Sequence, residues 1–310
     1  MTFSIVARCS RTGALGVAVS TAVPAVGAMC VYVRSGVGAV STQSWVNPYL
    51  ALNALDALKQ GADAERALEL VLQGDPAADL RQLGIVDSNG LSAASTGAQC
   101  TGWAGQRVSP SCSIQGNMLT GSATLDAMQA AFDAGAALAL EERLMRALEA
   151  GQAAGGDKRG RQSAAIRVVR DEAYASVDLR VDEHDDPVAE LRRVFEVAQR
   201  QVAPFVDAMP TRADPGRAPP ADVTCMLLTP PSSRPGASHR SGSDADVLAR
   251  WMGVEFATDR AIHNLSVYRS ILAEIGKLRT LDLSAQHPAV VFDVARVYGD
   301  RDSSPAAGGA

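Results

Sequence analysis

The sequence predicts an α+β fold in which antiparallel sheets pack together and helices cover their outer faces. Short apolar runs come in neighbouring pairs separated by turn residues, which is typical of antiparallel hairpins. Each of two such groups of hairpins is followed by segments with the three-and-four spacing of amphipathic helices. These patterns extend over about the first 205 residues of the 310-residue chain and do not fit a parallel Rossmann-type sheet.

The strands are expected in runs of valine, isoleucine and small residues. Arg11-Thr12-Gly13 and Ser35-Gly36 each separate two such runs, and Asn89-Gly90 is a strong hairpin signal. The expected strands are residues 3–8, 15–19, 29–33, 38–42, 81–86, 91–95, 113–119, 164–169 and 175–181.

The helices begin at recognisable capping residues. Asn47 is a plausible N-cap, and Pro48 suits the first turn of the helix that follows. Apolar side chains at helical spacing then predict helices over residues 50–58 and 63–72, one long helix from residue 122 to 148, and one over residues 187–202.

The composition changes near residue 209. We expect a first domain over residues 1–208, a proline-rich linker over 209–241 and a helical module with a flexible tail over 242–310. The apolar run 225–228 interrupts the linker, either as a docking segment or as a short strand. The apolar face of the module has no core of its own, so we expect it to contact a partner.

Charge and composition exclude several classes of function. The net charge of −5, with no cluster of basic residues, argues against nucleic-acid binding. No apolar segment is long enough to span a membrane. We therefore expect a cytoplasmic protein. The five cysteines lack CxxC spacing and the four histidines are scattered, so we expect buried thiols, no metal and no cofactor.

Thr2 is the first candidate for chemistry. It follows Met1 and leads directly into an apolar run. Removal of Met1 would give Thr2 a free α-amine within reach of its own hydroxyl, which combines a nucleophile and a base in one residue. No separate histidine is then needed to activate the hydroxyl.

Three polar stretches at the ends of expected strands supply further candidates. Residues 41–47 contain Gln43 and Asn47, and residues 115–117 contain Asn117. Residues 155–165 combine glycines with an acid and three cations, of which Lys158 and Arg161 are expected to be solvated surface residues. We assign Thr2, Asn117 and Asp157 to catalysis and assign to substrate binding Gln43, Asn47, Arg159, Gln162 and Ser163.

These stretches together resemble one known family. Residues 2–7, 36–43, 115–117 and 155–164 are similar to the corresponding motifs of the DUF1028 family, which is placed in the N-terminal nucleophile (Ntn) hydrolase superfamily. The resemblance covers about residues 1–205 and implies a four-layer αββα sandwich that hydrolyses amide C–N bonds. By the same resemblance, Thr2 matches the position of the nucleophile.

A second resemblance lies in the C-terminal module. Residues 244–296 look like the GatC- and AtzG-type small subunits that wrap around amidase-signature enzymes, although such subunits are usually separate chains. The resemblance implies an amidase-signature partner for this module.

Two functions from different classes follow. The first is an Ntn-type amidohydrolase of a small-molecule amide, which we expect to be a homo-oligomer. The second is a non-catalytic accessory or scaffold subunit of an amidase complex, in which Thr2 has no chemical role.

Overall fold

A computed structural model describes residues 2–234 of the chain, so the expected module over residues 242–310 lies outside the described residues. The strands form two sheets with antiparallel neighbours throughout. Sheet A has the order β10-β9-β2-β1-β8-β7, and sheet B has the order β3-β4-β5-β6. The strands are β1 (Thr2–Arg8), β2 (Leu15–Thr21), β3 (Val31–Arg34), β4 (Gly38–Ser44), β5 (Arg81–Asp87), β6 (Ser92–Thr96), β7 (Trp103–Ser109), β8 (Cys112–Leu119), β9 (Ser163–Val169) and β10 (Ala175–Val181).

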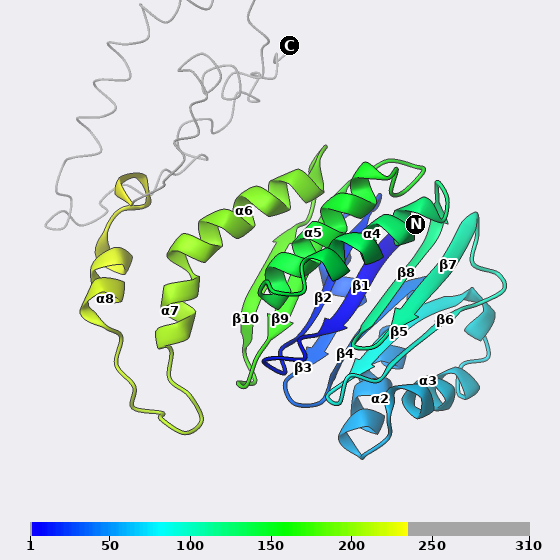
Figure 1. The fold of residues 1–310 in the computed structure, drawn as a ribbon, viewed down its shortest axis with the longest axis horizontal. Coiled ribbons are helices and arrows are strands. Elements are labelled where there is room, and N and C mark those ends of the chain that lie inside the picture. The colour runs from blue at the N-terminus through cyan, green and yellow to red at the C-terminus, as the bar shows by residue number, and fades with distance from the viewer. Residues whose placement is uncertain (1, 235–310) are drawn as a thin grey trace, which may run out of the picture. The chain divides into compact units, whose positions relative to one another are not determined.

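The two sheets face each other and helices cover both outer faces, as Figure 1 shows. Sheet A is covered by α4 (Ala123–Ala134), α5 (Leu140–Ala153) and α6 (Pro187–Gln201), and sheet B by α2 (Pro48–Lys59) and α3 (Ala64–Gln73). The fold is therefore the layered α+β sandwich that the sequence predicts.

Alternation along the strands sorts the side chains into layers. In β1, Phe3 and Ile5 pack into the apolar layer beneath the helices of sheet A, whereas Val6 belongs to the apolar cluster between the sheets. Thr2 and Ser4 share the parity of Val6 and therefore also face the space between the sheets. All of these residues are buried, so β1 is a central strand with both faces covered.

Three elements differ from the sequence-based expectation. The expected strand over 29–33 begins as the helix α1 (Val26–Cys30), and the strand β3 starts only at Val31. The expected long helix over 122–148 is two helices, because the chain breaks between Ala134 and Leu140. The strand β7 was not predicted, since its side chains are mostly half-exposed and lack a clear apolar alternation.

Two short helices follow α6, one before and one within the proline-rich segment. The helix α7 (Ala203–Ala208) follows α6 directly, and α8 (Ala221–Leu228) contacts α7. The apolar run 225–228 is thus the end of a helix, in which Val223 is the buried residue. Within residues 2–234, no helix is both long and apolar enough to cross a bilayer.

Candidate functional site

Thr2 begins the central strand of sheet A between two polar residues. The strand register pairs Thr2 with Thr21 of β2 on one side and with Asn117 of β8 on the other. The hydroxyls of Thr2 and Thr21 lie 3.2 Å apart, which is within hydrogen-bonding distance. Thr2 is 6% exposed and Asn117 is 2% exposed, so the candidate nucleophile is surrounded by polar groups of the protein and not by bulk water.

Asp157 lies beyond the start of β1, between the two strands that flank it. Its backbone forms a bridge to Leu119, two residues past Asn117 on β8, and its carboxylate accepts a hydrogen bond from the amide of Ala22, one residue past Thr21 on β2. Asp157 therefore occupies the place that a continuation of β1 ahead of Thr2 would take. This arrangement directs the backbone nitrogen end of Thr2 toward a buried carboxylate.

The loop before Asp157 explains how the carboxylate reaches this place. Gly155 and Gly156 both have positive φ, at 113° and 51°, where a side chain would be strained. The carboxylate is then fixed locally. It accepts a hydrogen bond from the backbone amide of Arg159 at 2.8 Å and forms an ion pair with the Arg159 guanidinium at 3.3 Å. The Asp157 side chain is 1% exposed and that of Arg159 is 39% exposed, so the carboxylate is buried while its partner reaches solvent.

A network of buried amides lies between the sheets directly behind Thr2. Gln43 of β4 donates from Nε2 to the Thr2 carbonyl oxygen at 3.3 Å and to Gln82 Oε1 at 2.8 Å. Its Oε1 accepts a hydrogen bond from Ser4 at 2.6 Å. Gln82 Oε1 also accepts from Asn117 Nδ2 at 2.9 Å, which links one neighbour of the candidate nucleophile to sheet B.

Gln115 completes this network from sheet A. Its Nε2 donates to Ser4 Oγ at 2.6 Å, and its Oε1 accepts from Ser113 at 2.8 Å. Gln43, Gln82 and Gln115 are all fully buried. Burial of amides is favourable only when their hydrogen bonds are made, and here each is held by several partners. The network therefore fixes the relative position of the two sheets at the Thr2 end.

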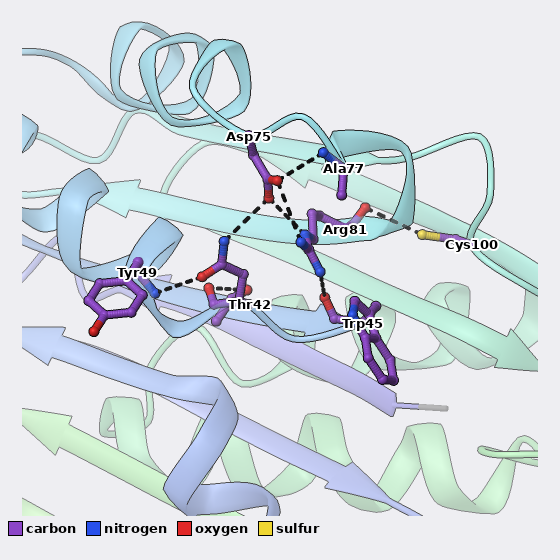
Figure 2. A network of polar contacts seen from close by, with 8 residues as sticks. Thr42, Trp45, Tyr49, Asp75, Ala77, Arg81 and Cys100 are labelled. Carbon is purple, nitrogen blue, oxygen red and sulfur yellow. Dashed lines mark hydrogen bonds and ion pairs between the residues drawn. The ribbon is translucent and has the colours of Figure 1, made fainter.

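A second buried polar cluster holds the end of β4, as Figure 2 shows. Arg81 donates from Nε to Asp75 at 2.7 Å and from NH1 to the carbonyl oxygen of Trp45 at 2.7 Å. The hydrogen bond from Arg81 lowers the pKa of Asp75 below its ordinary value. The Trp45 amide donates to the carbonyl oxygen of Leu80, and Ser44 just before it has a positive φ of 70°. The main chain at Trp45 is thus fixed from both sides.

Four of the predicted substrate-binding residues have structural contacts in this fold. Asn47 caps α2 through the amide of Tyr49 and donates to Asp75. Ser163 is fully buried, donates to the carbonyl oxygen of Val23 and accepts from the amide of Val26.

Gln162 makes its contacts through the backbone. Its amide donates a hydrogen bond to the carbonyl oxygen of Thr21, and its carbonyl oxygen accepts one from the amide of His184. Gln43 likewise belongs to the network between the sheets. These contacts hold the four residues in place, and Arg159 lies at the exposed edge of the site. The role of all five in substrate binding stays a prediction.

The structure places the predicted residues Thr2, Asn117 and Asp157 near one another. It also brings Thr21 and Gln82 to this place, and the sequence analysis did not name these two. Thr21 becomes a neighbour of Thr2 only through the register of β1 and β2, and Gln82 through the packing of the two sheets. The polar residue at a strand end was the available signal in both cases. Among residues 2–234, no group of three or more His, Cys, Asp or Glu side chains is placed to hold a metal ion.

Comparisons with known proteins place this architecture in a family. No curated protein matches the chain. Protein SPO2555 from Silicibacter pomeroyi, a solved structure of the DUF1028 family, is 32% identical, with a TM-score of 0.65 over 70% of this chain and 94% of that one.

Two structures of Anbu are more distant. Anbu from Yersinia bercovieri, described as an ancestral β-subunit, is 11% identical, with a TM-score of 0.33 over 64% of this chain and 96% of that one. The Gly-1 mutant of Anbu from Hyphomicrobium sp. strain MC1 is 14% identical, with a TM-score of 0.32 over 65% and 96%. Residues 2–191 match the family described as "Family of unknown function (DUF1028)". The chain therefore belongs to the DUF1028 family.

Proposed function

We propose that this protein is an N-terminal nucleophile amidohydrolase that cleaves the C–N bond of a small-molecule amide with Thr2. The observation that carries the proposal is the position of Thr2 at the start of the central strand, with its hydroxyl 3.2 Å from that of Thr21 and with Asp157 beyond the strand end. A terminal amine, a hydroxyl, polar neighbours and a carboxylate are the parts that this chemistry requires.

The reaction begins once the chain ahead of Thr2 has been removed. The free α-amine, with a reference pKa of about 7.7–8.0, accepts the proton of the Thr2 hydroxyl directly or through a water. The oxygen then attacks the amide carbonyl carbon to form a tetrahedral intermediate. Asp157 orients the amine and favours its protonated form, because an opposite charge nearby stabilises an ammonium.

Asn117 is the side chain that we assign to the oxyanion. A primary amide carries two N–H donors, and one of them is directed to Gln82 Oε1. The second donor and nearby backbone amides would stabilise the developing negative charge, which typically lowers the barrier by about 2.7–4 kcal/mol per donor. Collapse of the intermediate transfers the proton from the α-amine to the leaving nitrogen and leaves an ester on Thr2, which water then hydrolyses.

The test combines processing with mutation. Mass spectrometry of the purified full chain should show Thr2 as its first residue, and a panel of small amides should reveal release of ammonia or amine. Thr2→Ala should abolish the release while the far-ultraviolet circular dichroism is unchanged, and Thr2→Ser should retain part of it. A Thr2→Ala variant that keeps full activity would refute the proposal.

We further propose that residues 244–296 bind an amidase-signature enzyme. The support is the likeness of this segment to GatC- and AtzG-type subunits and the single apolar face of its expected helix. Co-expression with an amidase-signature protein, followed by affinity purification, tests the idea. The full chain should retain the amidase, and a chain lacking residues 242–310 should not; equal retention by both would contradict it.

A further inference from the structure

Trp45 is an exposed aromatic residue on a rigid main chain at the Thr2 end of the sandwich. Trp45 is 70% exposed, although large apolar residues are normally buried. Gln43, two residues before it, reaches the carbonyl oxygen of Thr2 with its side chain. Two residues span at most about 7 Å, so the main chain of Trp45 lies close to that of Gln43, which contacts Thr2, and Figure 2 shows the indole on the side on which β1 begins.

The main chain at Trp45 is fixed by hydrogen bonds on both of its polar groups. The amide of Trp45 donates to Leu80 at 3.2 Å, and its carbonyl oxygen accepts from Arg81 at 2.7 Å. Arg81 is itself held by Asp75, and the two side chains are only 10% and 5% exposed. Val46, the next residue, packs against the apolar cluster between the sheets. Only the indole is left to solvent.

The backbone just before Trp45 is in an unfavourable conformation. Ser44 has a φ of 70°, in the left-handed region that residues with a side chain rarely adopt. Such outliers persist where the surroundings enforce them and are concentrated at binding and catalytic sites. Here the left-handed turn ends β4 and aims Trp45 out of the strand. In Figure 2 the indole points away from Arg81, toward the side on which β1 begins.

We infer that Trp45 is a substrate-specificity residue, and that the acyl group transferred to Thr2 carries a planar or apolar substituent that stacks on the indole. This inference rests on the proposed function and names its substrate class. An indole supplies a large flat apolar surface at low entropic cost, because few of its torsions remain to be fixed. Rigid backbone anchoring adds preorganisation, which improves binding without adding contacts.

Chromogenic esters test the inference without knowledge of the natural amide. Attack of the Thr2 oxygen on p-nitrophenyl acetate or p-nitrophenyl phenylacetate breaks the aryl ester bond, releases p-nitrophenol and leaves the acyl group on Thr2. Water then cleaves the Thr2 ester to the free acid and restores the hydroxyl. The measured quantity is the ratio of kcat/KM for phenylacetate to that for acetate.

Trp45→Ala should lower this ratio roughly fivefold, as expected for the loss of one aromatic contact, with kcat/KM for acetate nearly unchanged. Trp45→Phe should keep most of the ratio. Tyr49→Ala is the matched control, since Tyr49 is 71% exposed and its ring, on α2, points away from Trp45 (Figure 2). It should leave the ratio unchanged.

Two failures are distinguishable in this design. If Thr2→Ala abolishes turnover of both esters but Trp45→Ala leaves the ratio as it is, the specificity role is overturned and the proposed function stands. If Trp45→Ala slows both esters equally, the role is also overturned. If Thr2→Ala still releases p-nitrophenol at the wild-type rate, the proposed function itself is wrong.

Discussion

The side chain of Gln43 donates a hydrogen bond to the carbonyl oxygen of Thr2 at 3.3 Å, so the first residue of sheet A is tied to a buried amide of sheet B. The same Nε2 contacts Gln82, which in turn contacts Asn117. The position of the candidate nucleophile therefore depends on how the two sheets pack. We therefore expect changes to this network to affect both the stability of the fold and the proposed activity of Thr2.

Replacing Gln43 with alanine tests this link. The change leaves Ser4 and Gln82 with fewer partners in a buried space, which should lower the free energy of unfolding by about 1–3 kcal/mol, in addition to the cost of the cavity. Urea unfolding followed by circular dichroism measures the loss. Gln60→Ala is the control, because Gln60 is exposed and should change stability by less than about 0.5 kcal/mol. Equal effects of the two changes would show that the network contributes nothing.

Gly84 leaves room for the Gln115 side chain between the sheets. A Cβ at position 84 would lie well inside the contact distance of the Gln115 carboxamide, which cannot turn away without losing its hydrogen bonds to Ser4 and Ser113. Gly84→Ala should therefore destabilise the protein by about 1–3 kcal/mol. Gly121→Ala, where a Cβ meets nothing, should be neutral or stabilising by up to about 1 kcal/mol in the same thermal or urea unfolding measurement. If Gly84→Ala has the same unfolding midpoint as the wild type, the packing described above is wrong.

Asp157→Asn keeps the shape of the carboxylate and removes its charge. Loss of this charge should lower the pKa of the Thr2 α-amine, because a nearby anion favours the protonated amine. The unprotonated amine is the active base, so the acidic limb of the pH–rate profile should move to lower pH while the maximal rate falls by roughly tenfold or more. A pH profile of p-nitrophenyl acetate hydrolysis gives both quantities. If the acidic limb of the pH–rate profile does not move and the maximal rate is unchanged, Asp157 has no role in the reaction.

The Asp75–Arg81 pair predicts a pH-dependent contribution to stability. The hydrogen bond from Arg81 lowers the folded-state pKa of Asp75, so the stabilisation is present above the unfolded pKa of about 3.9 and is lost as the pH falls through the lower folded value. Asp75→Asn should cost about 3–5 kcal/mol at neutral pH, since it leaves Arg81 buried without its counter-charge.

The difference between wild type and Asp75→Asn should shrink between about pH 5 and about pH 2 in urea unfolding. Asp56→Asn breaks an exposed pair with Arg34 and should cost no more than about 1 kcal/mol at neutral pH. A gap between wild type and Asp75→Asn that is constant with pH would refute the assignment.

The sequence was sufficient for the elements that have local signals. Asn47-Pro48 marks the start of α2 and Asn89-Gly90 marks the turn between β5 and β6, because capping and turn residues act over a few positions. The layered fold followed from the order of hairpins and helices. In contrast, β7 depends on pairing with β8, and α1 is a five-residue helix whose composition alone resembles a strand.

The site was predictable in its residue types and less so in its geometry. Thr2 was identified because it follows Met1, Asn117 because it lies in a polar stretch at a strand end, and Asp157 because it lies in a glycine-rich polar loop that leads into a strand. The structural roles of Asn47 and Ser163 depend on contacts with Asp75 and with the 23–26 turn, which no local pattern encodes. The exposure of Trp45 likewise follows from the left-handed Ser44 and the buried Arg81, which become neighbours only after folding.

The position of Asp157 has a practical consequence for handling the protein. Because this residue occupies the gap between β2 and β8 ahead of Thr2, a polypeptide fused to the N-terminus has no strand position to enter and must turn out of sheet A at once. Such a fusion also converts the Thr2 amine into an amide, which cannot act as a base. Affinity tags should therefore be cleaved to leave Thr2 first, and a lack of activity in an N-terminally tagged preparation is no test of the proposed function.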